Sequence, residues 1–254
     1  MQFTIDPWLA ADVTQRLVAA MTETLCASTP MLSWHGRRTD GCGVISEGGS
    51  AFLVRTPAGI IGVTAGHVLD GFVAARSFCK DITATLGGFR FDPEERLIMR
   101  GNTADIATFS VGEHDLPKIG FSPLERAWPP NTPASGGIVL LAGWPGQERI
   151  VSAERVTGGI YIGWGSAGVS DLQITIRVDH DQGPISPLPG VPLPPPGFEF
   201  GGISGGPVMV IDAEDSGHKI GWRVAGVISE GKPDYDYIIA ARADVIQDDG
   251  RITE

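Results

Sequence analysis

The stretch FGGISGGPVMV, residues 200–210, places a glycine-rich turn directly before an apolar run that is typical of a β-strand. Gly202 and Gly205 lie on either side of Ser204 in this stretch. Glycine accepts backbone angles that other residues resist, and it leaves no side chain over neighbouring N–H groups. Such a turn can present a serine hydroxyl together with free backbone donors, as a nucleophilic serine requires. Taken alone, the stretch also fits an ordinary bend, because glycine turns before strands are common.

The composition is that of a folded globular protein. Of 254 residues, 42% are hydrophobic and 19% are charged, which is far from the composition of disordered chains. The 35 glycines and 19 prolines favour many short strands joined by turns. The formal net charge of -11, without a basic stripe, argues against a nucleic-acid partner.

The cysteines and the N-terminal residues bear on the compartment. Cys26, Cys42 and Cys79 are an odd number in a long chain and lack the spacing of metal ligands, so we expect free thiols, although two of them could pair. We predict no metal and no cofactor. The first residues lack the basic and apolar regions of a signal peptide, and no apolar run is long enough to span a membrane. These features predict a cytoplasmic protein.

Residues 7–27 are predicted to form an amphipathic helix. Asp6 and Pro7 make a suitable cap and first turn. Apolar side chains recur every four residues, at Leu9, Val13, Leu17, Met21 and Leu25, which gives one apolar stripe. We expect this stripe to pack on the protein itself, with docking to a partner or a membrane as the alternative.

After this helix the chain alternates short apolar runs with turn residues, with no helical period between them. The predicted strands lie within residues 50–56, 59–66, 82–91, 96–99 and 105–111, and then within 137–144, 149–164, 172–178, 207–212, 220–229 and 237–243. Two such groups on either side of a proline-marked linker favour two antiparallel barrels or sandwiches in tandem, with a cleft at their junction. The predicted division is an N-terminal helical extension (1–30), a first barrel (31–122), a linker (123–136) and a second barrel (137–254) with a proline-rich insertion (183–198).

A histidine and an aspartate could supply Ser204 with its chemistry. A serine hydroxyl needs a base to take its proton, and the base needs a third group to orient it. His67 follows the apolar run 59–64 and Asp105 opens the run 105–111. The chain order His67, Asp105, Ser204 is one of three known orders for such a triad. Asp70 is closer to His67 in sequence, but we expect it to cap a turn instead.

Four patches in this order resemble the chymotrypsin-like (trypsin-fold) serine proteases, and in particular their disulfide-poor bacterial members. The patches are TAGHV (64–68), DIATFSV (105–111), GGISGGPV (201–208) and VAGVISEG (224–231). The resemblance covers about residues 43–243. It implies an all-β fold of two tandem antiparallel six-stranded β-barrels, here preceded by the N-terminal amphipathic helix, and the activity of a serine endopeptidase.

The resemblance also implies a role for each matching residue. Ser204 would be the nucleophile, His67 the general base and then acid, and Asp105 the group that orients His67. The backbone N–H groups of Gly202 and Ser204 would form the oxyanion hole, and the Ser229 hydroxyl would donate to Asp105.

Substrate recognition is expected along the last patch. Ser229 and Gly231 would pair with an extended peptide substrate as an added antiparallel strand, with Glu230 between them. Phe198, six residues before the serine, would form the floor of the specificity pocket and favour small or medium apolar residues. Glu199, Glu230, Asp234 and Asp236 leave a preference for basic residues as the alternative.

Ile203 departs from the family pattern. In secreted members an aspartate before the serine pairs with the amine that activating cleavage creates, and an alkyl group cannot make that ion pair. We therefore predict a site that assembles without N-terminal clipping, acting on a restricted set of intracellular proteins. A regulatory partner could bind the N-terminal helix or the proline-rich insertion. The alternatives are an inactive peptide-binding module of the same fold and an esterase that uses the same residues.

Overall fold

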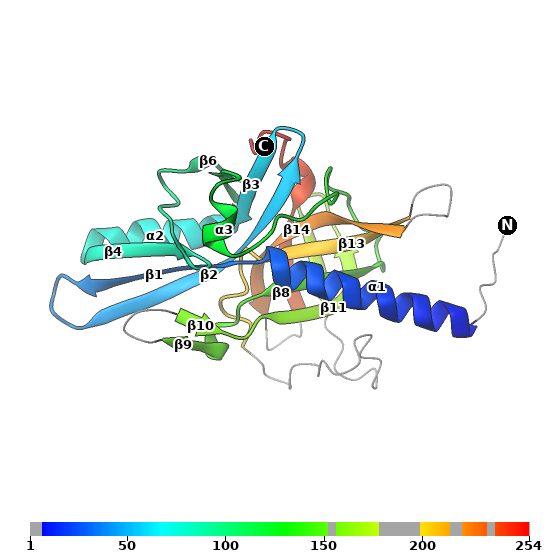
Figure 1. Cartoon of the computed structure of the whole chain (residues 1–254), viewed down its shortest axis with the longest axis horizontal. Helices are drawn as coiled ribbons and strands as arrows, with labels where there is room; N and C mark the ends of the chain where they lie inside the picture. The colour runs from blue at the N-terminus through cyan, green and yellow to red at the C-terminus, as the bar shows by residue number, and fades with distance from the viewer. Residues whose placement is uncertain (1–6, 152–155, 178–198, 214–219, 233–236, 254) are drawn as a thin grey trace.

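The strands form two antiparallel assemblies (Figure 1). The structure is a computed structural model, and it describes residues 7–151, 156–177, 199–213, 220–232 and 237–253. The proline-rich insertion predicted at 183–198 lies outside the described residues.

The N-terminal half forms a seven-stranded antiparallel sheet. Its strand order is β5-β4-β1-β2-β3-β7-β6. The strands are β1 (Met31–Arg38), β2 (Val44–Thr56), β3 (Gly59–Thr64), β4 (Cys79–Leu86), β5 (Phe89–Arg90), β6 (Leu97–Arg100) and β7 (Ala107–Val111). Apolar side chains of β2 and β3 are fully buried, among them Phe52, Leu53 and Val63.

The C-terminal half forms a closed antiparallel barrel of six strands in the order β11-β12-β15-β14-β13-β8. The strands are β8 (Ile138–Gly143), β11 (Tyr161–Val169), β12 (Gln173–Arg177), β13 (Pro207–Ala213), β14 (Ile220–Lys232) and β15 (Tyr237–Arg242). A separate hairpin joins β9 (Arg149–Val151) to β10 (Val156–Gly158). The predicted, mainly β fold of two antiparallel assemblies is confirmed. The second assembly is the expected closed six-stranded barrel, whereas the first is a seven-stranded sheet rather than a six-stranded barrel.

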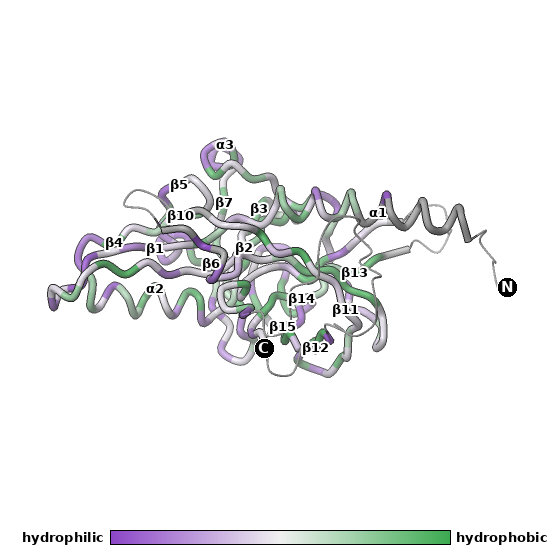
Figure 2. The backbone as a smooth tube through the Cα atoms, turned by 90° about the horizontal axis from the view of Figure 1, so that it is seen from below, coloured by the Kyte–Doolittle hydropathy of each residue, from purple (hydrophilic) through white to green (hydrophobic). Residues whose placement is uncertain are grey.

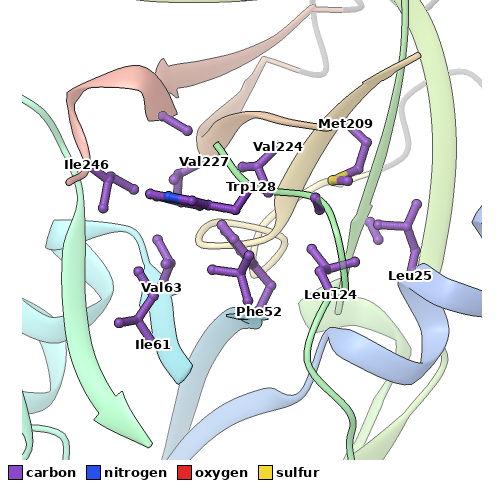
Figure 3. Close-up of a cluster of buried hydrophobic side chains, with 14 of the residues drawn as sticks. Leu25, Phe52, Ile61, Val63, Leu124, Trp128, Met209, Val224, Val227 and Ile246 are labelled. Atoms are coloured by element: carbon purple, nitrogen blue, oxygen red, sulfur yellow. The ribbon is translucent and has the colours of Figure 1, made fainter. Parts of the chain in front are cut away.

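One hydrophobic cluster joins the two halves. Phe52 and Val63 of the first sheet pack there with Val227 of the barrel and with Trp128 from the segment between them (Figure 3). Figure 2 shows hydrophobic stretches along the strands in the middle of the molecule and on parts of α2. Because burial of apolar surface drives folding, this shared cluster holds the junction of the halves in a defined geometry.

The predicted N-terminal helix is present as α1 (Pro7–Ser28). Met21 and Leu25 are each 1% exposed and belong to the cluster between the halves. This is the expected packing of the stripe on the protein itself, as far as its side chains are described. The N-terminal end of α1 extends past the strands (Figures 1 and 2).

The expectation that no helix lies between the strands was wrong. Residues Gly66–Phe78 form α2, which buries Val68, Phe72 and Ala75 in the core of the first sheet. The spacing of these three residues is helical. A single helical turn, α3 (Leu116–Ile119), follows β7.

Two further expectations concern the state of the three cysteine thiols and the presence of a membrane-spanning helix. Cys26, Cys42 and Cys79 are all free. In the described part of the chain, no helix combines the length and the apolar character needed to cross a bilayer.

Candidate active site

His67 and Asp105 meet at one end of the first sheet. His67 is the second residue of α2, which begins directly after β3, and Asp105 comes just before β7. Because β3 and β7 are paired neighbours, their ends bring the two side chains together. The imidazole Nδ1 lies 2.7 Å from one Asp105 oxygen, and the His67 backbone N–H donates to the other oxygen at 2.8 Å. Asp105 thus fixes both the ring and the backbone of the histidine.

Charges around this pair shift both pKa values. The hydrogen bond to Asp105 raises the pKa of His67 above its usual value, although burial acts against it. Burial acts to raise the pKa of Asp105, but the hydrogen bonds from His67 outweigh it and lower that pKa. Asp70 lies within α2 and, among the described contacts, neither caps a turn nor bonds to the imidazole. It pairs with Arg100 at 2.8 Å, and the Arg100 guanidinium also lies 4.0 Å from Asp105.

The turn that carries Ser204 needs glycine for two reasons. Gly202 has φ +96° and Gly205 has φ +89°, in the region that favours glycine. A side chain at Gly205 would also collide with the Ser50 carbonyl, 2.0 Å from the position of its Cβ, and with the Thr64 hydroxyl. This close approach places the Ser204 turn against the end of β3, three residues before His67.

The backbone donors of the turn fall into two groups. The N–H groups of Ile203, Gly205 and Gly206 each donate to a backbone carbonyl at 2.7 to 3.1 Å. Among the described residues, the N–H groups of Gly202 and Ser204 donate to no acceptor. These two are the groups that the sequence predicted for the oxyanion hole. Most backbone donors in folded proteins have a partner, so two donors without one in a single partly buried turn are available to a ligand or water.

Hydrogen bonds to the preceding carbonyls hold these two peptide groups in place. The Gly146 N–H donates to the Gly201 carbonyl at 2.5 Å, and the Ile203 carbonyl accepts a bond of 2.9 Å. In a trans peptide the C=O and the following N–H point in opposite directions. Each bond to a carbonyl therefore turns the N–H of Gly202 or Ser204 away from the partner, leaving it available.

The Ser204 hydroxyl rests on the neighbouring strand. Its Oγ donates to the Ser229 carbonyl at 2.9 Å, and among the described hydrogen bonds none joins Ser204 to His67. The Ser229 hydroxyl likewise makes no described bond to Asp105; both residues line a cavity of about 240 Å³. A hydrogen bond from Ser204 to His67 would require the Ser204 side chain to rotate away from Ser229.

The end of β14 presents a free strand edge beside Ser204. β13 pairs with β14 only as far as the contact of Pro207 with Val227, whereas β15 follows β14 to Lys232. Among the described strands, none pairs with the edge around Ser229, Glu230 and Gly231 on the β13 side. A register shift lies between Ile228 and Glu230. Unpaired backbone groups at such an edge can accept an added strand.

The specificity pocket is described only in part. Gly231 lies against Phe200, whose Cβ would be 2.4 Å from a Cβ at Gly231, and the Phe200 ring packs edge-on against Tyr161. Phe198, Asp234 and Asp236 lie outside the described residues. Glu230 pairs with Lys232 at 2.5 Å, so part of its charge is neutralised, and Glu199 is exposed.

Two residues that the sequence analysis missed also hold the turn. The buried Ser50 hydroxyl accepts from the Trp144 N–H at 2.8 Å and donates to the Gly202 carbonyl at 3.1 Å. Arg149 donates to the same carbonyl at 3.2 Å. Neither residue lies in a recognisable motif, and only the contact between distant segments reveals them.

Comparison with known proteins gives structural neighbours only. No family model and no curated protein matches the chain. Similar solved structures include the thermostable serine protease AL20 from an extremophilic microorganism, with 14% identity, 85% of this chain and 91% of that chain covered, and a TM-score of 0.46. A catalytically inactive tobacco etch virus protease complexed with substrate has 9% identity, coverage of 85% and 78%, and a TM-score of 0.43. A serine protease of a human pathogenic astrovirus has 14% identity, coverage of 83% and 88%, and a TM-score of 0.39.

Proposed function

We propose that this chain is a serine endopeptidase with His67, Asp105 and Ser204 as its catalytic residues. The observation that carries the proposal is the pair of N–H groups, of Gly202 and Ser204, that donate to no described acceptor while the donors around them are paired. Preorganised donors of this kind stabilise an oxyanion, and a single one contributes about 100- to 1000-fold to kcat.

The residues divide the reaction as follows. Ser204 Oγ forms a bond to the scissile carbonyl carbon while its proton passes to His67 Nε2, and the carbonyl oxygen becomes an oxyanion facing the two N–H groups. The C–N bond then breaks as His67 returns the proton to the leaving amine, which gives an acyl-enzyme. Water, deprotonated by His67, attacks the acyl carbon. His67 then returns this proton to Ser204 Oγ as the acyl C–O bond breaks, which releases the carboxylic acid product. Asp105 keeps the Nδ1 proton on His67 and stabilises the imidazolium.

The substrate is proposed to be an extended peptide that pairs with the free edge of β14 at Ser229 and Gly231. The Phe200 ring beside Gly231 and the Glu230 charge paired with Lys232 favour small or medium apolar residues before the cleaved bond. A basic preference is the alternative. The three free thiols fit a reducing compartment, so we propose that the enzyme acts in the cytoplasm.

The second candidate is an inactive peptide-binding module. The hydrogen bond from Ser204 to the Ser229 carbonyl is compatible with it, because this bond directs the hydroxyl to a carbonyl rather than to His67. A fluorophosphonate probe with intact-mass analysis separates the two candidates. The peptidase account expects one adduct on the wild type, none on Ser204→Ala, and slow labelling of Asp105→Asn. An unlabelled, folded wild type would reject it.

A further inference from the structure

Arg149, the first residue of β9, donates to three backbone carbonyls, two of which lie far away in the sequence. One guanidinium nitrogen donates to the Gly48 carbonyl of β2 at 3.0 Å. The other donates to the Trp144 carbonyl at 3.1 Å and to the Gly202 carbonyl at 3.2 Å. The side chain thus connects the first sheet, the loop after β8 and the turn that carries Ser204.

The environment of Arg149 is unusual for a cation. Its Nε is buried without a hydrogen-bond partner in the described part of the chain, and no described carboxylate forms an ion pair with the guanidinium. Burial lowers the pKa of Arg149, but a guanidinium stays charged in proteins. Burying a charge without an opposite charge is costly. The three carbonyl oxygens are therefore what compensates for the loss of water.

The Gly202 carbonyl is the atom through which Arg149 acts on the turn that carries Ser204. Glycine can rotate about both of its backbone bonds more freely than any other residue. Gly146 fixes the peptide group before Gly202 through the Gly201 carbonyl, and Arg149, with Ser50, fixes the peptide group after it. With both peptide groups held, the direction of the Gly202 N–H is set.

We propose that Arg149 is a positioning residue. Its guanidinium, a cation from within the folded chain, holds the turn that carries Ser204 (the oxyanion turn, residues 201–206) in its active geometry. Ile203 is fully buried in the apolar core of the barrel and cannot receive a cation, so the cation acts on the backbone carbonyl beside it. This inference rests on the proposed function and names what keeps that site assembled.

The position of Arg149 permits a rescue experiment. It lines an open groove of about 490 Å³, together with Glu47, Gln147 and Glu199. Removing the side chain would leave a space that guanidinium from solution can enter through this groove. Arg149→Met removes the cation and keeps an apolar side chain. Arg55→Met is the matched control. Arg55 is a residue of β2, the strand that Arg149 contacts through Gly48, but its guanidinium pairs with the exposed Glu113 and Glu125.

The experiment measures kcat and KM on a peptide substrate, fluorophosphonate labelling and thermal unfolding for the wild type and both variants. A misplacement of about 1 Å in a catalytic group can cost about 100-fold. We therefore expect Arg149→Met to lose about 100-fold in kcat and in labelling rate with KM little changed. Guanidinium chloride below unfolding concentrations should restore part of the loss, while sodium chloride of equal ionic strength should not. Arg55→Met should keep the wild-type kcat.

Each other outcome decides against the inference. A wild-type kcat in folded Arg149→Met, or a loss confined to KM, would overturn it, the latter by making Arg149 a substrate contact. If Arg149→Met does not fold, Arg149→Gln replaces it, since the amide keeps donors and removes the charge. Failure of both to fold would make Arg149 a residue of general stability and also overturn the inference. A wild type that the probe does not label would reject the proposed function instead.

Discussion

Replacing Gly202 with alanine tests the oxyanion turn at its most constrained point. The added Cβ would lie 2.9 Å from both the Gly146 nitrogen and the Trp144 carbonyl oxygen, and 2.6 Å from the Arg149 guanidinium. The side chain of Arg149 could move, but the two backbone atoms could not do so without shifting the loop. The φ of +96° adds strain of about 1 to 3 kcal/mol for a residue other than glycine.

The turn would relieve these contacts by rotating the peptide groups around residue 202, which moves the Gly202 N–H away from the oxyanion. Loss of one such donor lowers kcat about 100- to 1000-fold, or about 3 to 4 kcal/mol of transition-state stabilisation. KM should change much less, because the donor acts mainly on the tetrahedral species. Steady-state kinetics on a peptide and the rate of fluorophosphonate labelling measure both effects.

The neighbouring glycine provides a matched control. A Cβ at Gly201 would meet no atom within 4 Å. Gly201 is also not one of the glycines with a positive φ. Gly201→Ala should therefore keep most of the activity while adding the same methyl group one residue earlier. Equal kcat values for Gly202→Ala and the wild type would refute the assignment of the Gly202 N–H to the oxyanion hole. Equal losses in both alanine variants would refute the steric reasoning.

Three further predictions concern charge and packing. His67 acts as a base only when neutral and its pKa is raised, so kcat/KM should rise with pH through a pKa above about 6.5. Arg100 lowers the pKa of His67 and Asp70 raises it. In pH–rate profiles, Arg100→Met should therefore move the rise of kcat/KM to higher pH, and Asp70→Asn should move it to lower pH. Shifts of the same sign would contradict the electrostatic account. Leu25→Ala should lower the free energy of unfolding by about 2 to 5 kcal/mol, because Leu25 is 1% exposed, whereas the exposed Glu23→Ala should change it by less than about 0.5 kcal/mol in denaturant titrations.

The strands could be predicted from the sequence because β-branched and apolar runs end at glycine or proline. Helix α2 was missed, although Val68, Phe72 and Ala75 repeat with a helical spacing. Glycine disfavours a helix, and Gly66 and Gly71 in this segment obscure that spacing. Strand β1 was missed for a different reason. Its charged end and its Ser33, which is buried against Thr85, hide the apolar alternation that marks a strand.

In the candidate site, too, some residues could be predicted from local sequence and others could not. His67, Asp105 and Ser204 stand in short motifs whose residue types the chemistry demands, so local sequence was enough to select them. Arg149 and Ser50 act on the Gly202 carbonyl through contacts that cross 53 and 152 positions of the chain. Only folding brings such partners together, and an arginine at the start of a strand has no local pattern that distinguishes it from a solvated one.

The central claim is that Ser204 hydrolyses peptide bonds, and mapping of newly formed protein N-termini tests it most directly. Wild-type protein and the Ser204→Ala variant are incubated separately with a denatured proteome, and the N-termini that arise are identified by mass spectrometry. The account predicts new N-termini in the wild-type sample alone, sharing a preference at the residue before the cut. The same set of N-termini in both samples, or none in either with both proteins folded, would contradict it.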